Sequence, residues 1–218
     1  MEKANKKGSE NFAYVANIAL RLLVICAFIA ALVAAVNYIT KDKIAMNQKK
    51  ATAEALSSIY AEQNMVFSVS EDGSSYVVND LDGNIVGSCE SLAGEFEADI
   101  DAVYVIKDTD SEVLGYCVEA SPMGFKDEIG ILVAVNPDVT LKELSIISLK
   151  DTKGIGDKVM LPDFLDKFKN KSPGFADSEQ GLKEMVISGA TRTSEPVTKA
   201  ADTALKQIQK IVAGEEEK

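Results

Sequence analysis

The residues with the clearest potential for chemistry are hydroxyl-bearing side chains on a predicted tight turn before a helix. They lie in residues 188–196, SGATRTSEP. The small side chains at the start of this stretch would let a ligand approach the backbone closely. The N–H groups of a helix start attract phosphate, and Arg192 adds a positive charge beside them. The hydroxyl of Thr191 is therefore placed where a phosphate group could bind.

The helix after this turn is predicted to begin at Pro196. Ser194 is a favourable N-cap, and proline is favoured in a first helical turn. Residues 196–212 form an amphipathic helix whose apolar face carries Val197, Ala201, Leu205, Ile208 and Val212. A turn capped in this way needs no ligand, so these residues by themselves favour a structural role.

A second stretch with possible chemistry is DTKGIGDKV, residues 151–159, which follows a predicted strand at 144–149. Two glycines surround Ile155, and a lysine lies on each side of them. Glycine-rich turns can hold phosphate, but this one lacks the spacing of a Walker loop or a dinucleotide-binding motif. Alone, it is weak support for a binding site.

Three pairs of apolar runs separated by turn residues predict β-hairpins. They are SSYVVNDLDGNIVGSC, AVYVIKDTDSEVLGYCVEAS and EIGILVAVNPDVTLKELSIISL. A short helix is predicted from Pro162, and residues 172–174 mark a loop. The predicted fold class is therefore α+β, a mostly antiparallel sheet with packed helices. The apolar residues that its core needs lie almost entirely after Tyr76.

An apolar stretch near the N-terminus, residues 12–39, predicts a transmembrane helix. Its part 22–39 alone would rise ~27 Å as a helix, close to the thickness of the hydrocarbon layer. A cleavable signal peptide is the alternative, but the apolar run is long for one. Four basic residues lie before residue 22 and four lie between 41 and 50, so the distribution of charge does not decide its orientation. Residues 40–63 contain no proline or glycine and predict a helix that continues beyond the membrane.

The composition excludes several kinds of function. The chain has a formal net charge of −11, and no basic residue lies between positions 51 and 106, so nucleic-acid binding is not expected. The chain has no histidine and no cysteine pair with metal-ligand spacing. We therefore expect no metal site and no set of catalytic residues. Cys89 and Cys117 could form a disulfide or remain as two buried thiols.

The order of these features resembles a known family of domains that bind FMN covalently. The resemblance rests on the N-terminal apolar segment, the strand pair GILVAVNPDVTLKELSIISL, the turn TKGIG and the motif SGATRTS before the last helix. The family includes the G subunit of the Rnf electron-transport complex, and the C subunit of the sodium-translocating NADH:quinone reductase is a relative. This sequence departs from the usual pattern at Met185, where an acidic residue is common, and at Lys153, where proline is common.

The resemblance implies a cofactor and the residues that hold it. FMN would be joined to Thr191 through a phosphoester bond, made by a separate flavin transferase that uses FAD. Thr193 and Ser194 would lie near the phosphate. The attachment motif would be completed by Ser188, Gly189 and Ala190, and the flavin pocket would be lined by Gly154, Ile155 and Gly156.

The resemblance also implies a function and a division of the chain. The protein would be a redox subunit of an ion-translocating ferredoxin:NAD oxidoreductase, bound to the complex's other membrane and peripheral subunits and without independent catalytic activity. Residues 1–40 would form a cytoplasmic tail and membrane anchor, 41–63 a helical linker, and 64–218 an extracytoplasmic FMN-binding domain. Two alternatives remain, a membrane-anchored binding or scaffold module without flavin, and the equivalent subunit of the quinone reductase.

Overall fold

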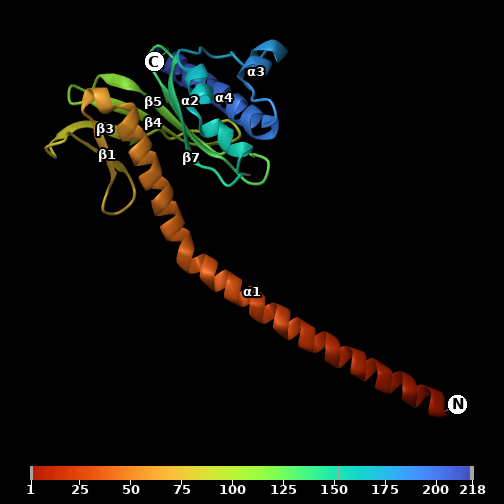
Figure 1. The fold of residues 1–218 in the computed structure, drawn as a ribbon. Coiled ribbons are helices and arrows are strands. Elements are labelled where there is room, and N and C mark those ends of the chain that lie inside the picture. Colours follow the sequence, from red (N-terminus) through yellow and green to blue (C-terminus); the bar gives the residue numbers. More distant parts are fainter. Residues whose placement is uncertain (1, 152, 217–218) are drawn as a thin grey trace. The chain divides into compact units, whose positions relative to one another are not determined.

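The computed structural model describes residues 2–151 and 153–216, and the chain divides into two compact units (Figure 1). The units are Met1–Asn47 and Gln48–Lys218. Helix α1 (Glu2–Ile59) supplies the first unit and the beginning of the second. Within the described part of the chain, α1 holds one segment that is long and apolar enough to cross a membrane, by length and composition. The predicted apolar helix is therefore present.

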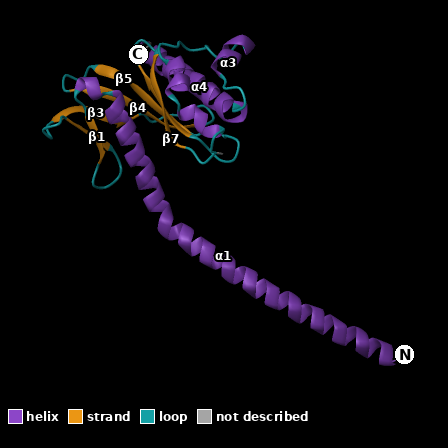
Figure 2. Cartoon of the chain, in the orientation of Figure 1, coloured by secondary structure: helices purple, strands orange, loops and turns teal. Residues whose placement is uncertain are grey.

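The second unit is built around one antiparallel sheet of seven strands in chain order (Figure 2). The predicted hairpins are confirmed as the pairs β2–β3, β4–β5 and β6–β7. β1 follows a short 3₁₀ helix, η1 (Ala61–Gln63), and lies outside the predicted hairpins. The strands are β1 (Val66–Val69), β2 (Tyr76–Asn79), β3 (Ile85–Ser91), β4 (Ile100–Asp108), β5 (Val113–Ala120), β6 (Gly130–Val135) and β7 (Leu141–Ser148).

Aspartate side chains close the turns of two predicted hairpins. The Asp80 carboxylate accepts hydrogen bonds from the backbone N–H groups of Asp82 at 2.9 Å and Asn84 at 2.8 Å. Asp108 does the same for Asp110 and Glu112, both at 2.9 Å. Because aspartate readily satisfies nearby backbone donors, such turns can be recognised from local sequence.

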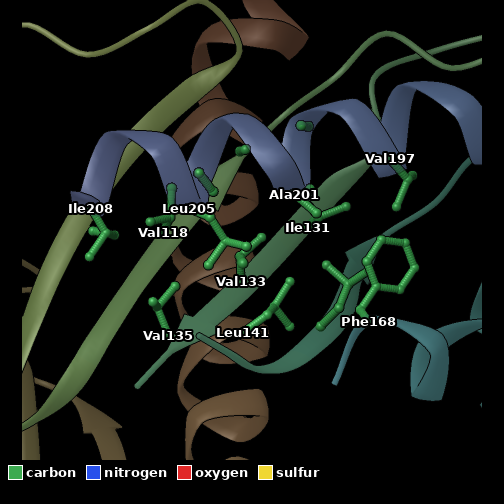
Figure 3. Packing of buried hydrophobic residues seen from close by; sticks show 14 of the residues in the cluster. Val118, Ile131, Val133, Val135, Leu141, Phe168, Val197, Ala201, Leu205 and Ile208 are labelled. Atoms are coloured by element: carbon green, nitrogen blue, oxygen red, sulfur yellow. The ribbon is translucent and has the colours of Figure 1, made fainter. Parts of the chain in front are cut away.

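Helices from the C-terminal half cover one face of the sheet (Figure 3). Val197, Ala201 and Leu205 of the last helix pack against inward-facing side chains of β5 and β6. The predicted amphipathic face is confirmed, and the fold class is α+β. The helical elements are η2 (Gly156–Met160), α2 (Pro162–Leu165), η3 (Asp166–Phe168), α3 (Glu179–Met185) and α4 (Thr191–Glu216).

The opposite face of the sheet has a second core, to which the end of α1 contributes. Leu56 and Tyr60 are fully buried there, together with Phe67 of β1. The expectation that the core lies almost entirely after Tyr76 is therefore wrong. Because both faces are covered, β6 is a continuous apolar run with Ile131 in one core and Leu132 in the other.

Cys89 and Cys117 are buried free thiols. Cys89 pairs with Ile106 of β4, whereas Cys117 pairs with Tyr104 of the same strand. The two cysteines are thus separated by a complete strand, about 9.6 Å at the usual spacing of neighbouring strands. A disulfide needs Cα atoms within about 7 Å, so the fold keeps these thiols apart.

Candidate functional site

The residues before α4 form a tight turn that requires a glycine. The Ala190 N–H donates to the Ile187 carbonyl at 3.0 Å. Gly189, between them, has a φ of +82°, and a side chain built on it would meet nothing within 4 Å. Backbone conformation, not crowding, therefore explains the glycine, because other residues are strained at this φ.

Helix α4 begins at Thr191, five residues before the predicted start at Pro196. The N–H groups of Thr193 and Ser194 already donate to the Ala190 carbonyl, at 3.0 and 2.9 Å. Pro196 consequently lies inside the helix. Proline has no N–H to donate to the carbonyl four residues earlier. The free-energy cost of this missing hydrogen bond is smaller near a helix start, where the first N–H groups have no helical partner.

Ser194 has a different role from the predicted N-cap. Its hydroxyl donates to the Ala190 carbonyl at 3.0 Å and accepts the Ile187 N–H at 3.0 Å. The side chain is fully buried. Ser194 thus ties both sides of the turn to the helix, and it is not available to a ligand.

The hydroxyl groups of the motif differ sharply in exposure. Thr191 is exposed, whereas Thr193 is 2% exposed and donates to Asp151 Oδ2 at 2.5 Å. Ser188 is also exposed, but it borders a separate hollow of ≈340 Å³ beside Lys158 and Lys167. Of the residues predicted to contact the phosphate, Thr193 and Ser194 therefore point into the protein.

Thr191 borders a pocket of ≈330 Å³. Ile155 and Phe125 supply its large apolar side chains, and residues 189–193 complete its lining. The guanidinium carbon of Arg192 lies 5.3 Å from the centroid of the Phe125 ring, a cation–π contact. Volumes of this order are usual for small-molecule and cofactor sites.

Only one of the three residues predicted from the glycine-rich turn lines this pocket, and that residue is Ile155. Gly154 has a φ of +81°, a backbone conformation in which other residues are strained. Gly156 is buried, and a Cβ there would lie 2.6 Å from the Cγ of Asp151. The two glycines therefore position Ile155 instead of contacting a ligand in the pocket.

The sequence did not indicate that Phe125 belongs to this site. It lies in the connection between β5 and β6, far from both motifs in the chain. Its local sequence carries no binding pattern, and only the fold brings it beside Arg192. A second hollow of ≈510 Å³ shares Thr191 and Arg192 and includes Met123 from the same connection.

The pocket has the chemistry that a flavin mononucleotide requires. Phe125 and Ile155 are 52% and 49% exposed, and a flat aromatic ring would cover this apolar surface favourably. A phosphate at Thr191 would face the start of a helix of 26 residues and the charge of Arg192. The side chains present therefore suit both ends of FMN.

Comparison with known proteins places the pocket within a recognised domain. Residues 124–206 match the FMN-binding domain family, and this range contains every residue of the pocket at Thr191. Residues 15–59 match the RnfG N-terminal region. The chain therefore contains an FMN-binding domain, and FMN is the cofactor of this class of domain.

A curated relative is similar to this chain over about half its length. The chain is 33% identical over 106 residues to the G subunit of the proton-translocating ferredoxin:NAD(+) oxidoreductase complex of Clostridium ljungdahlii. The matched region covers 45% of this chain and 56% of that relative, slightly more than half its length. Together with the matches to the RnfG N-terminal region and the FMN-binding domain, this similarity supports identification of the chain as an RnfG homologue. The resemblance noted in the sequence is confirmed.

Proposed function

We propose that this protein is an electron-carrying subunit of a membrane-bound, ion-translocating ferredoxin:NAD oxidoreductase, with FMN joined to Thr191 by a phosphoester bond. The observation that supports the attachment site is the exposure of its hydroxyl. Thr191 is exposed at the pocket of an FMN-binding domain, whereas Thr193 and Ser194 are buried and hydrogen-bonded within the protein. An attachment enzyme could reach Thr191 without unfolding the turn.

The residues around Thr191 would bind and orient the cofactor. FMN supplies reversible electron transfer when it is bound. Arg192 and the N–H groups at the start of α4 would neutralise the phosphate, while Phe125 and Ile155 would cover the ring and limit its contact with water. A covalent link keeps the carrier at one position between turnovers, which suits a relay.

Attachment would be a phosphoryl-group transfer from FAD, catalysed by a separate flavin transferase. The Oγ1 atom of Thr191 would attack the phosphorus on the flavin side of the FAD pyrophosphate. A new P–O bond forms to Thr191, the pyrophosphate P–O bond breaks, and AMP leaves. The threonine proton passes to a base of the transferase and then to solvent. No atom changes its oxidation state in this transfer, so no oxidant is needed.

The proposed partners are the other membrane and peripheral subunits of an Rnf-type complex. The RnfG N-terminal region and the relative's name favour this complex over the sodium-translocating quinone reductase. The relative is described as part of a proton-translocating complex.

We expect the native protein to carry covalently bound FMN. Protein purified from its own host in detergent should be yellow, and its denatured band should fluoresce in a gel. Intact mass should exceed the sequence mass by one FMN residue. A colourless protein of unmodified mass would support the alternative of a binding or scaffold module without flavin.

We also propose that the domain lies outside the cytoplasmic membrane, as the family resemblance implies. Asp82 offers an exposed position for a labelling test, because the Asp80 carboxylate needs only its backbone N–H. In a chain with Cys26→Ser, the variant Asp82→Cys should react with a membrane-impermeant maleimide in intact cells. The parent with Cys26→Ser is the control, since its remaining thiols are buried. Labelling that requires cell lysis would place the domain in the cytoplasm.

A further inference from the structure

The carboxylate of Asp151 lies between the glycine-rich turn and the first turn of α4. Its Oδ2 atom accepts the Thr193 hydroxyl at 2.5 Å, and Thr193 is almost completely buried. On the other side, the Asp151 side chain lies against Gly156. A Cβ built at Gly156 would be 2.6 Å from Asp151 Cγ and 2.7 Å from Oδ2, closer than real contacts allow.

These contacts join the two walls of the pocket. Ile155 projects from the glycine-rich turn, whereas Thr191 and Arg192 belong to α4. Asp151 contacts the residue after Ile155 and the residue after Arg192. One carboxylate that does not line the pocket therefore contacts both segments.

The same hydrogen bond influences the direction of Thr191. Successive residues of an α-helix are rotated by about 100°, so residues two apart point to nearly opposite sides. Thr193 is held inward by Asp151, and Thr191 is exposed. Fixing the inward residue thus helps to keep the Thr191 hydroxyl directed toward the pocket.

We infer that Asp151 is a positioning residue for the FMN site. Its carboxylate holds the Gly154–Gly156 turn against the first turn of α4, and so sets the separation between Ile155 and Thr191. Asp151 acts through Thr193 and Gly156, without contact to the flavin. The inference rests on the proposed flavin at Thr191, and it can be tested by two measurements. One measurement needs the flavin, and the other needs only the polypeptide.

The first measurement is hydrogen exchange of the Lys158 and Leu161 backbone amides, which donate to the Ile155 and Lys158 carbonyls at 3.4 and 3.2 Å. The full chain is expressed without flavin transferase and held in detergent. Asp151→Ala and Thr193→Val should each increase exchange about tenfold, because a charge-assisted hydrogen bond is lost. Thr193→Ser should restore slow exchange, since it keeps the hydroxyl. Gly156→Ala should reproduce Asp151→Ala, because the added methyl group displaces the carboxylate.

Two matched controls lie further along α4. Thr198 is fully buried and donates to the Ser194 carbonyl at 2.8 Å, and Asp202 is a buried carboxylate that accepts the Gly174 N–H at 2.7 Å. Thr198→Val and Asp202→Asn should lower thermal stability without changing exchange of the Lys158 and Leu161 amides. If the controls accelerate this exchange as much as Asp151→Ala does, Asp151 has only a general structural role.

The second measurement uses the flavinylated full chain. Asp151→Ala should lower the fluorescence anisotropy of the attached flavin and shift its midpoint potential, because Ile155 no longer holds a fixed position against the ring. Asp151→Asn should give an intermediate change, since its amide oxygen can still accept the Thr193 hydroxyl. Unchanged anisotropy and potential in Asp151→Ala would overturn the inference.

The two proposals can fail separately. A parent chain without covalent flavin would contradict the proposed function, while the exchange data would still decide whether Asp151 fixes the turn. A fully flavinylated parent in which Asp151→Ala leaves exchange of the Lys158 and Leu161 amides unchanged would overturn the positioning role alone.

Discussion

Replacing Thr191 with valine should leave a folded protein that carries no covalently bound flavin. Valine keeps the branched shape of threonine, and the side chain is exposed at the start of α4, so little packing is lost. The turn is held by other groups, namely the Ser194 hydroxyl and the Ala190 N–H. Without Oγ1 there is no atom to esterify, and in-gel flavin fluorescence should fall to background.

The appropriate control for this variant is Thr193→Ser. Thr193→Val would remove a hydroxyl that donates to Asp151 and would leave a partly buried carboxylate without this donor, at a cost of about 1–3 kcal/mol. Serine keeps the donor and should retain covalent flavin. If Thr191→Val still fluoresces, Thr191 is not the attachment site.

Removing residues 1–47 should leave a folded domain, whereas removing residues 1–60 should unfold it. The second compact unit begins at Gln48, and its core includes Leu56, Ile59 and Tyr60. Loss of each large buried side chain costs about 2–5 kcal/mol. Three such losses together approach or exceed the total stability of a typical domain, about 5–15 kcal/mol.

Thermal unfolding followed by far-UV circular dichroism would measure this difference. The chain 48–218 should melt cooperatively, and it keeps Lys49, whose Nζ atom donates to the Gly73 carbonyl at 2.5 Å. Leu56→Ala in the same chain should lower the free energy of unfolding by about 3 kcal/mol. A chain beginning at residue 61 that melts at the same temperature as 48–218 would show that α1 is dispensable for the fold.

The sequence alone determined the features that depend on neighbouring residues. The hairpin turns were recognisable because aspartates such as Asp80 and Asp108 bind backbone donors within four residues. The apolar face of α4 was recognisable because helical periodicity is local. The proposed attachment motif could be located for a similar reason, since its residues are contiguous in the chain.

Features that depend on contacts between distant segments were decided by the tertiary structure. Helix α4 begins at Thr191, although the sequence preference of Ser194 suggested an N-cap at that residue. Ser194 instead accepts a hydrogen bond from the turn before the helix. The end of α1 entered the core because the second face of the sheet needs an apolar cover. Neither outcome follows from the intrinsic conformational preferences of the residues. The free energies of these preferences are small compared with those of burying apolar side chains.

The same distinction applies to the pocket. The sequence identified Thr191 and Ile155, but it did not show that Phe125 would lie against Arg192 or that Asp151 would bind Thr193. These pairs are far apart in the chain and meet only after the sheet and α4 have packed together. Chemistry carried by a contiguous motif can be predicted from sequence, whereas the walls of a pocket are determined by packing.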